Sequence, residues 1–313
     1  MKKFFGIDTS YEKTWRCREN ALMYVRGTLE DSYSKLPSYL HMLRQKNPGT
    51  STDLFHLRWL FPILLLFLGV CRRGFRSCRP VIYMDGTFLK KKYGGHMLCV
   101  VSFDTNSHLY PIMFGLVNSE NHNSCKYFMT KLKEAIGDID DLSFVSDMHA
   151  SIIHALEIVF PHVYHGACYR HINMNVKAKS KTDHSHNEMN AATYVWKKTE
   201  FQMHFVNIKQ MNPSIAEYLE GIGFNKWYRL FFHGKRYNIL TSNYAKSFNN
   251  KTSDERTFPV TNFLEFIQFT LQSLFSERRS ASKNNTTKLS PPIEADLSQI
   301  PDKGRFMSVY AIA

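Results

Sequence analysis

Hydrophobic and polar positions along the chain change their period near residue 79. Before it, apolar residues between positions 10 and 46 recur at steps of three and four, which is typical of helices. Between residues 81 and 117 three short apolar runs follow one another, and turn-forming residues separate them: VIYMDGTFL, HMLCVVSFD and LYPIMFGLV. Consecutive strands joined by short links predict an antiparallel meander.

Helices and strands alternate after the meander. Apolar positions from Cys125 to Ile136 share one helical face, and the run LSFVSD at 142–147 indicates a fourth strand. A second helical stripe covers 152–160, and VYHGAC at 163–168 indicates a fifth strand. The order β-β-β-α-β-α-β predicts an α/β fold, namely an RNase H-like mixed five-stranded sheet with flanking helices.

The strand pattern stops after His171, and an aromatic-rich helical segment follows. We expect this segment to interrupt the core as an insertion. The residues after 281 begin with Ser, Pro, Asn and Thr and are expected to be loosely ordered. The predicted organisation is a helical lead-in (1–50), an apolar connecting segment (51–78), an RNase H-like core (79–172), a helical insertion (173–238), return helices (239–280) and a tail (281–313).

One stretch, WLFPILLLFLGV at 59–70, is apolar enough to suggest a membrane. It is about a dozen residues long, whereas a spanning helix needs about 20 apolar residues. It also contains Pro62 and is followed at once by CRRGFR. We therefore predict a buried core segment and no membrane partner. The six cysteines are scattered and are expected to be reduced intracellular thiols.

The charge of the chain points to a polyanionic partner. Lys and Arg number 40 against 27 Asp and Glu, a formal net charge of +13 with a pI near 9.4. Nucleic acid is the usual partner of such a chain, and a basic but inert surface is the alternative. The basic residues of the stretch 71–92 have the composition that phosphate contacts need, although a solvated rim would look similar: Arg72, Arg73, Arg76, Arg79, Lys90, Lys91 and Lys92.

Two aspartates follow buried apolar runs. Asp85 ends the first run and Asp147 the fourth, and in an RNase H topology these two strands are neighbours. Paired carboxylates repel unless a cation bridges them, and hard oxygen ligands favour Mg²⁺ or Mn²⁺. Taken singly, Asp85 could be a turn residue and Asp147 a helix cap. Cys168 and His171 form a Cys-x-x-His pair, but zinc usually needs four ligands, so a structural thiol beside a hydrogen-bonded histidine is favoured over zinc.

Several motifs then carry a resemblance: GFRSCRPVIYMDGTFLKKKYGG, YPIMFGLVNSENHNSCKYF and LTSNYAKSFNN, in this order. The chain resembles the plant Mutator-like element (MULE) transposases of the MuDR type, in the DDE class. The resemblance covers nearly the whole length. It implies an RNase H-like catalytic core with a helical insertion, a nuclear location, dependence on Mg²⁺ or Mn²⁺, and cut-and-paste transposition acting on double-stranded DNA at transposon ends.

The resemblance also assigns roles to residues. The two metal-binding aspartates fall on Asp85 and Asp147, and the family's Cys/Asp-x-x-His feature falls on Cys168 and His171. The third carboxylate is a glutamate in relatives, whereas this chain has Lys246. A protonated lysine cannot ligate Mg²⁺. The chain also shows no Cys/His-rich zinc motif, so it resembles a truncated or degenerate copy.

Two functions therefore remain open. One is a transposase-derived DNA-binding protein without catalysis. The other is an active metal-dependent transposase or endonuclease that cuts and joins transposon ends with a substitute carboxylate, for which Asp254 and Glu255 are the nearest candidates in sequence. A homo-oligomer is compatible with both.

Overall fold

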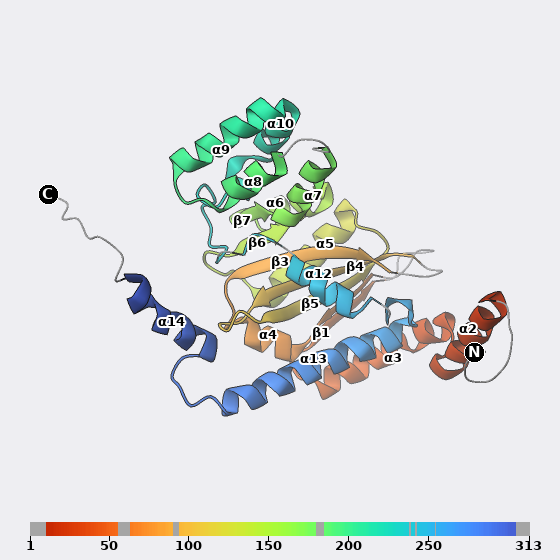
Figure 1. Ribbon diagram of the computed structural model, residues 1–313. Coiled ribbons are helices and arrows are strands. Elements are labelled where there is room, and N and C mark those ends of the chain that lie inside the picture. Colours follow the sequence, from red (N-terminus) through yellow and green to blue (C-terminus); the bar gives the residue numbers. More distant parts are fainter. Residues whose placement is uncertain are drawn as a thin grey trace.

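The computed structural model describes residues 11–55, 63–89, 94–179, 185–237, 239–241, 243–253 and 255–304. A twisted sheet lies at the centre with helices on both of its faces, and a separate block of helices adjoins one edge (Figure 1). Across these residues, no helix combines the length and the apolar character that a membrane crossing would need.

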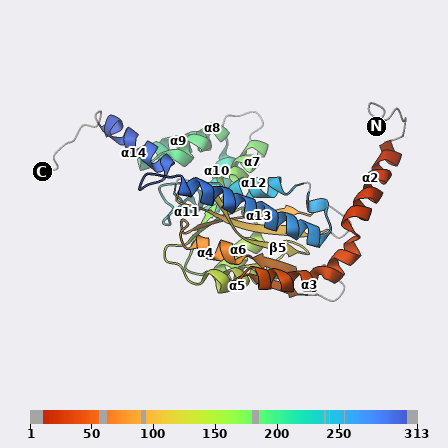
Figure 2. The ribbon, with the colours of Figure 1, turned by 90° about the horizontal axis from the view of Figure 1, so that it is seen from below.

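Two helices come first, α2 (Tyr11–Arg26) and α3 (Leu29–Lys46). A capping box starts α3: the Thr28 hydroxyl accepts a hydrogen bond from the Asp31 amide, and the Asp31 carboxylate accepts one from the Thr28 amide. Helix α3 packs along the long helix α13 (Val260–Lys283), whereas α2 projects away from the body of the molecule (Figure 2).

The sheet is mixed and has seven strands in the order β1-β2-β5-β4-β3-β6-β7. The prediction of a mixed sheet with flanking helices is confirmed, but its count of five strands is wrong, because β1 and β2 extend the sheet beyond β5. All five residues of β2 are buried, so this strand lacks the alternation that would identify it from sequence. The strands are β1 (Ser51–Phe55), β2 (Ile63–Phe67), β3 (Val81–Phe88), β4 (His96–Phe103), β5 (Leu109–Val117), β6 (Ser143–Ser146) and β7 (Tyr164–Ala167).

At strand β3 the sheet changes from antiparallel to parallel pairing. It pairs with β4 in the antiparallel sense and with β6 in the parallel sense, and β7 continues parallel to β6. The first and fourth predicted strands are therefore neighbours, as the sequence led us to expect. The carboxyl ends of β3 and β6 meet at one edge of the sheet, which is where ligands gather in open α/β sheets.

The two faces of the sheet are covered by different helices. Phe114 of β5 lies with its ring centroid 5.0 Å from that of Phe248 on α12 (Asn243–Lys251). Its neighbour Gly115 faces the other way, where an added Cβ would lie 2.6 Å from Phe128 of α5 (His122–Ile136). Helices α5 and α6 (Ala150–Val159) pack together on that second face, while α4 (Gly69–Phe75) contacts β5.

The helical block has a hydrophobic core of its own. Phe201 lies at its centre and stacks on Tyr228 with the ring centroids 4.0 Å apart. Trp227 is buried beside it and donates a hydrogen bond from Nε1 to the Leu219 carbonyl oxygen. The helices are α7 (Tyr169–Lys179), α8 (Ser185–Tyr194), α9 (Lys198–Met211), α10 (Pro213–Ile222) and α11 (Phe224–Trp227).

The chain returns to the sheet through α12, the short 3-10 helix η1 (Glu255–Thr257) and α13. The expectation of a loosely ordered tail is wrong for Pro291–Gly304, which form helix α14. Its sequence PPIEADLSQIPDKG begins with Pro, a residue suited to a first helical turn, but carries no long apolar stripe.

Candidate active site

Asp85 is a buried carboxylate near the carboxyl end of β3. It pairs across the sheet with Cys99, which pairs in turn with Phe114, so its side chain lies on the face covered by α12. The Asn249 side-chain amide of α12 donates a hydrogen bond of 3.0 Å to Asp85 Oδ2. Burial raises the pKa of Asp85 to about 6, and the charge of Asp147 also raises it, while His171, Asn249 and Lys246 act in the opposite direction.

Asp147 follows the last residue of β6 and is partly buried. The parallel register pairs Val81 with Ser143 and Tyr83 with Val145, so two further steps place Asp147 level with Asp85. The Asp147 carboxylate accepts a hydrogen bond of 3.2 Å from the His149 amide at the start of α6. Asp147 therefore binds the backbone just before α6, whose N-cap position is His149, and it is level with Asp85 on the neighbouring strand.

Lys246 approaches from α12, the helix that packs on β3, β4 and β5. Its side chain is partly buried, and its charge lowers the pKa of Asp85. Lys246 forms no ion pair within 4 Å with a carboxylate of the described residues. The lysine thus acts on Asp85 as a positive charge without a direct ion pair. Asp254 lies outside the described residues, and Glu255 belongs to η1 beyond the end of α12.

The Cys-x-x-His pair, Cys168 and His171, lies near the same two aspartates. Cys168 is fully buried at the end of β7, and His171 lies in the first turn of α7. The pKa of His171 is raised, first by a hydrogen bond with Cys168 and then by the charges of Asp147 and Asp85, while burial opposes this. The pair therefore sets a histidine beside the carboxylates.

Sequence reasoning missed a third acidic residue here, Glu120. It lies between β5 and α5, on the face of the sheet opposite to the Asp85 side chain. Its carboxylate packs against the backbone of Gly86: an added Cβ there would lie 2.9 Å from Glu120 Oε2. Burial raises the pKa of Glu120 to about 6, and the charges of Asp147 and Asp85 also raise it. Its position just after a buried strand was the signal that could have found it.

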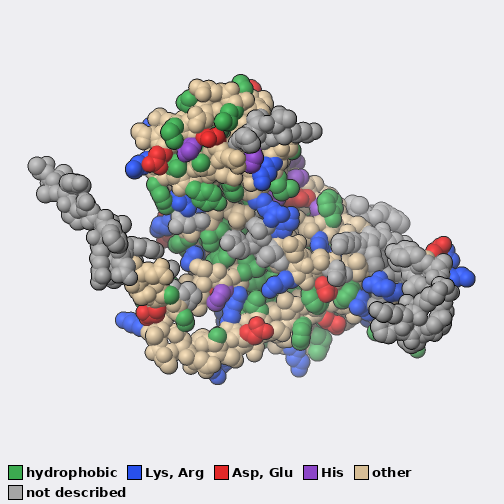
Figure 3. Space-filling view, in the orientation of Figure 1, with side chains coloured by type: hydrophobic (Ala, Val, Ile, Leu, Met, Phe, Trp, Pro, Cys, Tyr) green, Lys and Arg blue, Asp and Glu red, His purple; other side chains and the backbone are tan. Residues whose placement is uncertain are grey.

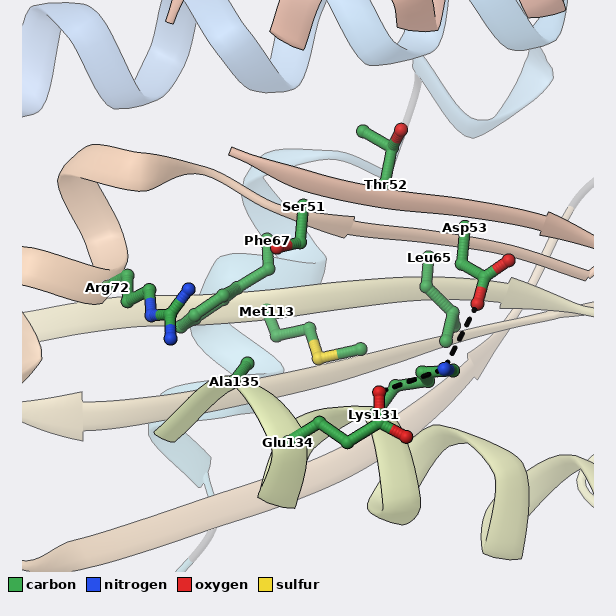
Figure 4. A pocket seen from close by; sticks show the side chains of 10 residues that line it. All are labelled: Ser51, Thr52, Asp53, Leu65, Phe67, Arg72, Met113, Lys131, Glu134 and Ala135. Carbon is green, nitrogen blue, oxygen red and sulfur yellow. Dashed lines mark hydrogen bonds and ion pairs between the residues drawn. The ribbon is translucent and has the colours of Figure 1, made fainter. Parts of the chain in front are cut away.

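The predicted basic residues do not converge on this site. Arg79 lies two residues before β3 and six residues before Asp85, which is roughly 20 Å of extended chain. Figure 4 shows Arg72 lining a pocket in which Lys131 is paired with Glu134 at 2.9 Å. Arg73 donates to the Pro48 carbonyl oxygen. Basic side chains on the face shown in Figure 3 are interspersed with acidic ones. The stretch Lys90, Lys91 and Lys92 lies outside the described residues, and a DNA-binding role of these groups stays a prediction.

A divalent cation fits this arrangement in chemistry but not in geometry. The carboxylate oxygens of Asp85, Asp147 and Glu120 are donors of the kind that Mg²⁺ and Mn²⁺ prefer. Within the described ranges, however, no three His, Cys, Asp or Glu side chains lie close enough together to hold a metal ion. Lys246 adds a positive charge to the same space. As arranged, the residues do not form a metal centre, and zinc at Cys168 and His171 has no support from a third ligand there.

One family model matches the part of the chain that contains these residues. Residues 81–175 match the family model described as the MULE transposase domain. This segment begins at the first residue of β3, contains Asp85, Glu120 and Asp147, and ends four residues beyond His171. A comparison with curated proteins found no match. The match makes a transposase-related function the best-supported class for this chain.

Proposed function

We propose that this chain is a DNA-binding protein derived from a MULE transposase that no longer catalyses strand transfer. The observation that carries the proposal is the position of Lys246 on α12, the helix that packs on β3, from which its charge acts on Asp85. The match of residues 81–175 to the MULE transposase domain supports this ancestry.

The topology supports an RNase H-like core. Five strands of the sheet have the order β5-β4-β3-β6-β7, which in chain order is third, second, first, fourth and fifth. The first three are antiparallel and the last two run parallel to the first. This is the arrangement that the RNase H-like prediction requires, with the helical block of α7 to α11 inserted after the fifth strand.

Lys246 explains the loss of catalysis. Two-metal cleavage of a phosphodiester needs two cations about 4 Å apart, held by carboxylates. An ammonium stabilises the charged forms of nearby carboxylates by balancing their negative charge. Unlike a metal ion, it offers no coordination position for an attacking or leaving oxygen. The MULE transposase family generally depends on a divalent metal, so a site closed to metal predicts a protein without transposition activity.

Binding to double-stranded DNA follows from ancestry and charge. The net charge of +13 predicts affinity for the phosphate backbone that falls steeply with salt. We propose a nuclear location on the same grounds, with transposon ends as the ancestral partner. Expression of the chain with a fluorescent tag tests the location, and retention of the tagged chain in the cytoplasm would contradict the proposed nuclear location.

The test of the function combines binding and chemistry. Duplex binding is measured by fluorescence anisotropy across a salt series, and cleavage and joining are measured on labelled duplex ends with Mn²⁺ present. We expect salt-sensitive binding and no product above the level given by Asp85→Ala. Product that Asp85→Ala abolishes would instead establish the alternative, an active nuclease with a substitute carboxylate. Glu120 is the structural observation that favours that alternative.

A further inference from the structure

We propose that the helical block binds unpaired DNA by base stacking, on a surface formed by Tyr194, Trp196 and Arg229. We call this surface the aromatic–arginine platform. Its residues come from the end of α8, from the link between α8 and α9, and from the segment after α11. The inference rests on the proposed function and deepens it, because it names single-stranded DNA as a ligand and gives that ligand a place on the molecule.

Two aromatic side chains surround one guanidinium at the surface of the block. Trp196 is 59% exposed and Tyr194 is 46% exposed. The Arg229 guanidinium lies 4.4 Å from the centroid of the Trp196 ring and 5.5 Å from that of the Tyr194 ring. It also donates a hydrogen bond of 3.3 Å to the Tyr194 carbonyl oxygen. These contacts orient the indole before a ligand arrives, and because Arg229 covers one face of the ring, a further planar group can stack on the other.

The platform does not serve the hydrophobic core of the block. That core contains the aromatic residues Phe201, Trp227 and Tyr228, and among the described residues it includes neither Tyr194 nor Trp196. Packing of the block therefore does not account for the exposed indole. A nucleic acid base does, because every base presents a planar face that stacks on an aromatic side chain or on a guanidinium.

Basic side chains beside the platform suit the phosphates of such a strand. Lys197 and Lys198 follow Trp196 directly, and both are exposed. Lys197 lies 3.4 Å from the Glu200 carboxylate, whereas Lys198 has no ion pair within the described ranges. With Arg229, three positive charges stand here against one negative charge. Aromatic faces combined with excess positive charge are the pattern that binds single-stranded nucleic acid, so a strand of DNA fits this surface better than an apolar protein partner.

The platform lies next to the edge of the sheet that carries the candidate active site. The parallel register of β6 and β7 makes Cys168 level with Asp147. Tyr169 follows Cys168, and its ring centroid lies 5.6 Å from that of Tyr194. Helices α8 and α9 lie beyond β7 at this end of the molecule (Figure 1). A DNA strand that passes the carboxyl ends of β6 and β7 can therefore place an unpaired base on the platform.

The experiment measures binding of the full chain to three labelled DNA probes by fluorescence anisotropy at one salt concentration. The probes are single-stranded oligothymidine, an abasic strand with the same phosphates but no bases, and a duplex. The variants are Trp196→Ala and Trp196→Phe. Phe269→Ala is the matched control, because Phe269 on α13 is 67% exposed and its neighbours Gln268 and Thr270 carry no charge. Circular dichroism checks folding, and Trp196→Leu replaces the alanine variant should that one fail to fold.

We expect Trp196→Ala to weaken binding of oligothymidine by between about fivefold and about a hundredfold, because it removes the ring on which a base stacks. Trp196→Phe keeps a ring and should bind within about fivefold of the natural chain. The abasic strand and the duplex should lose less than about twofold in Trp196→Ala, since their phosphate contacts remain. Phe269→Ala should leave all three affinities unchanged.

The three probes separate failure of the inference from failure of the proposed function. Equal losses for all three probes in Trp196→Ala, or no loss for oligothymidine, would overturn the inference, while duplex binding by the natural chain would leave the proposed function intact. A natural chain that binds the duplex but not oligothymidine would have the same meaning. A natural chain that does not bind the duplex would overturn the proposed function and, with it, this inference.

Discussion

Replacing Asp85 with asparagine should stabilise the folded chain at neutral pH. The Asp85 carboxyl is 6% exposed, and burial raises its pKa from 3.8 to about 6. Because the folded state holds the proton more tightly than the unfolded state, ionisation favours unfolding. The penalty is absent below pH 3.8, grows as the pH rises to 6, and is constant above that. Asparagine carries no charge at any pH and should escape the penalty.

The size of the effect follows from the two pKa values. They differ by about two pH units, and each unit corresponds to about 1.4 kcal/mol, so the full penalty is about 3 kcal/mol. Roughly half of it should be present at pH 5 and all of it above pH 7. The hydrogen bond to Asn249 survives the substitution, since the asparagine Oδ1 can accept from the same amide.

Urea unfolding followed by circular dichroism, in EDTA, measures the gain between pH 5 and pH 8. Asp138→Asn is the control, because that side chain is 91% exposed and its replacement should change stability by less than about 0.5 kcal/mol. No gain at pH 8, or an equal gain at both pH values, would refute the argument that burial sets the ionisation of Asp85.

Three further outcomes are expected. Gly86→Ala should destabilise the fold by about 1–3 kcal/mol in urea unfolding, because the new methyl would meet the Glu120 carboxylate, and Glu120→Ala in the same chain should recover part of the loss. Trp227→Phe should loosen the helical block by about 1–3 kcal/mol through loss of packing and of the bond to Leu219, detected as faster limited proteolysis between residues 185 and 230. Alanine at 90–92 should weaken duplex binding and lower the salt slope in anisotropy titrations by up to about three, whereas an unchanged slope would remove these lysines from the interface.

The central strands could be predicted because their sequence shows two signals at once. Each of β3 to β7 is a short apolar run bounded by turn residues, and an acidic residue closes the apolar part of β3 and another directly follows β6. Parallel neighbours bring such residues together, so the pairing of Asp85 with Asp147 was accessible from order alone. Helix α12 could be placed only through the resemblance, because its nine residues NYAKSFNNK carry no chemical signal of their own.

The added strands could not be predicted for a physical reason. Strand β2 is covered on both faces, so its run ILLLF has no period, and β1 has only five residues with a mixed burial pattern. Helix α14 was missed because Ser, Pro, Asn and Thr before it mark a turn, and the turn hid the helix that follows.

Closeness in sequence also gave a wrong impression of which residues lie together in the folded chain. The basic residues between 72 and 92 form one run in the sequence, but Arg79 and Asp85 are separated by the length of a strand. Conversely, Glu120 and Gly86 are 34 positions apart and are in contact. The stretch NSEN around Glu120 has the polarity of a helix start. That explanation of its polar residues hid the role of Glu120 as an acidic residue of the site.

The position of Lys246 relative to the two aspartates is the central claim, and anomalous diffraction tests it most directly. Crystals of the natural chain grown with Mn²⁺ would be measured at the manganese absorption edge. We predict the Lys246 ammonium beside Asp85 and Asp147 with no manganese peak between them. A manganese peak coordinated by both aspartates, with Lys246 turned away, would contradict the account.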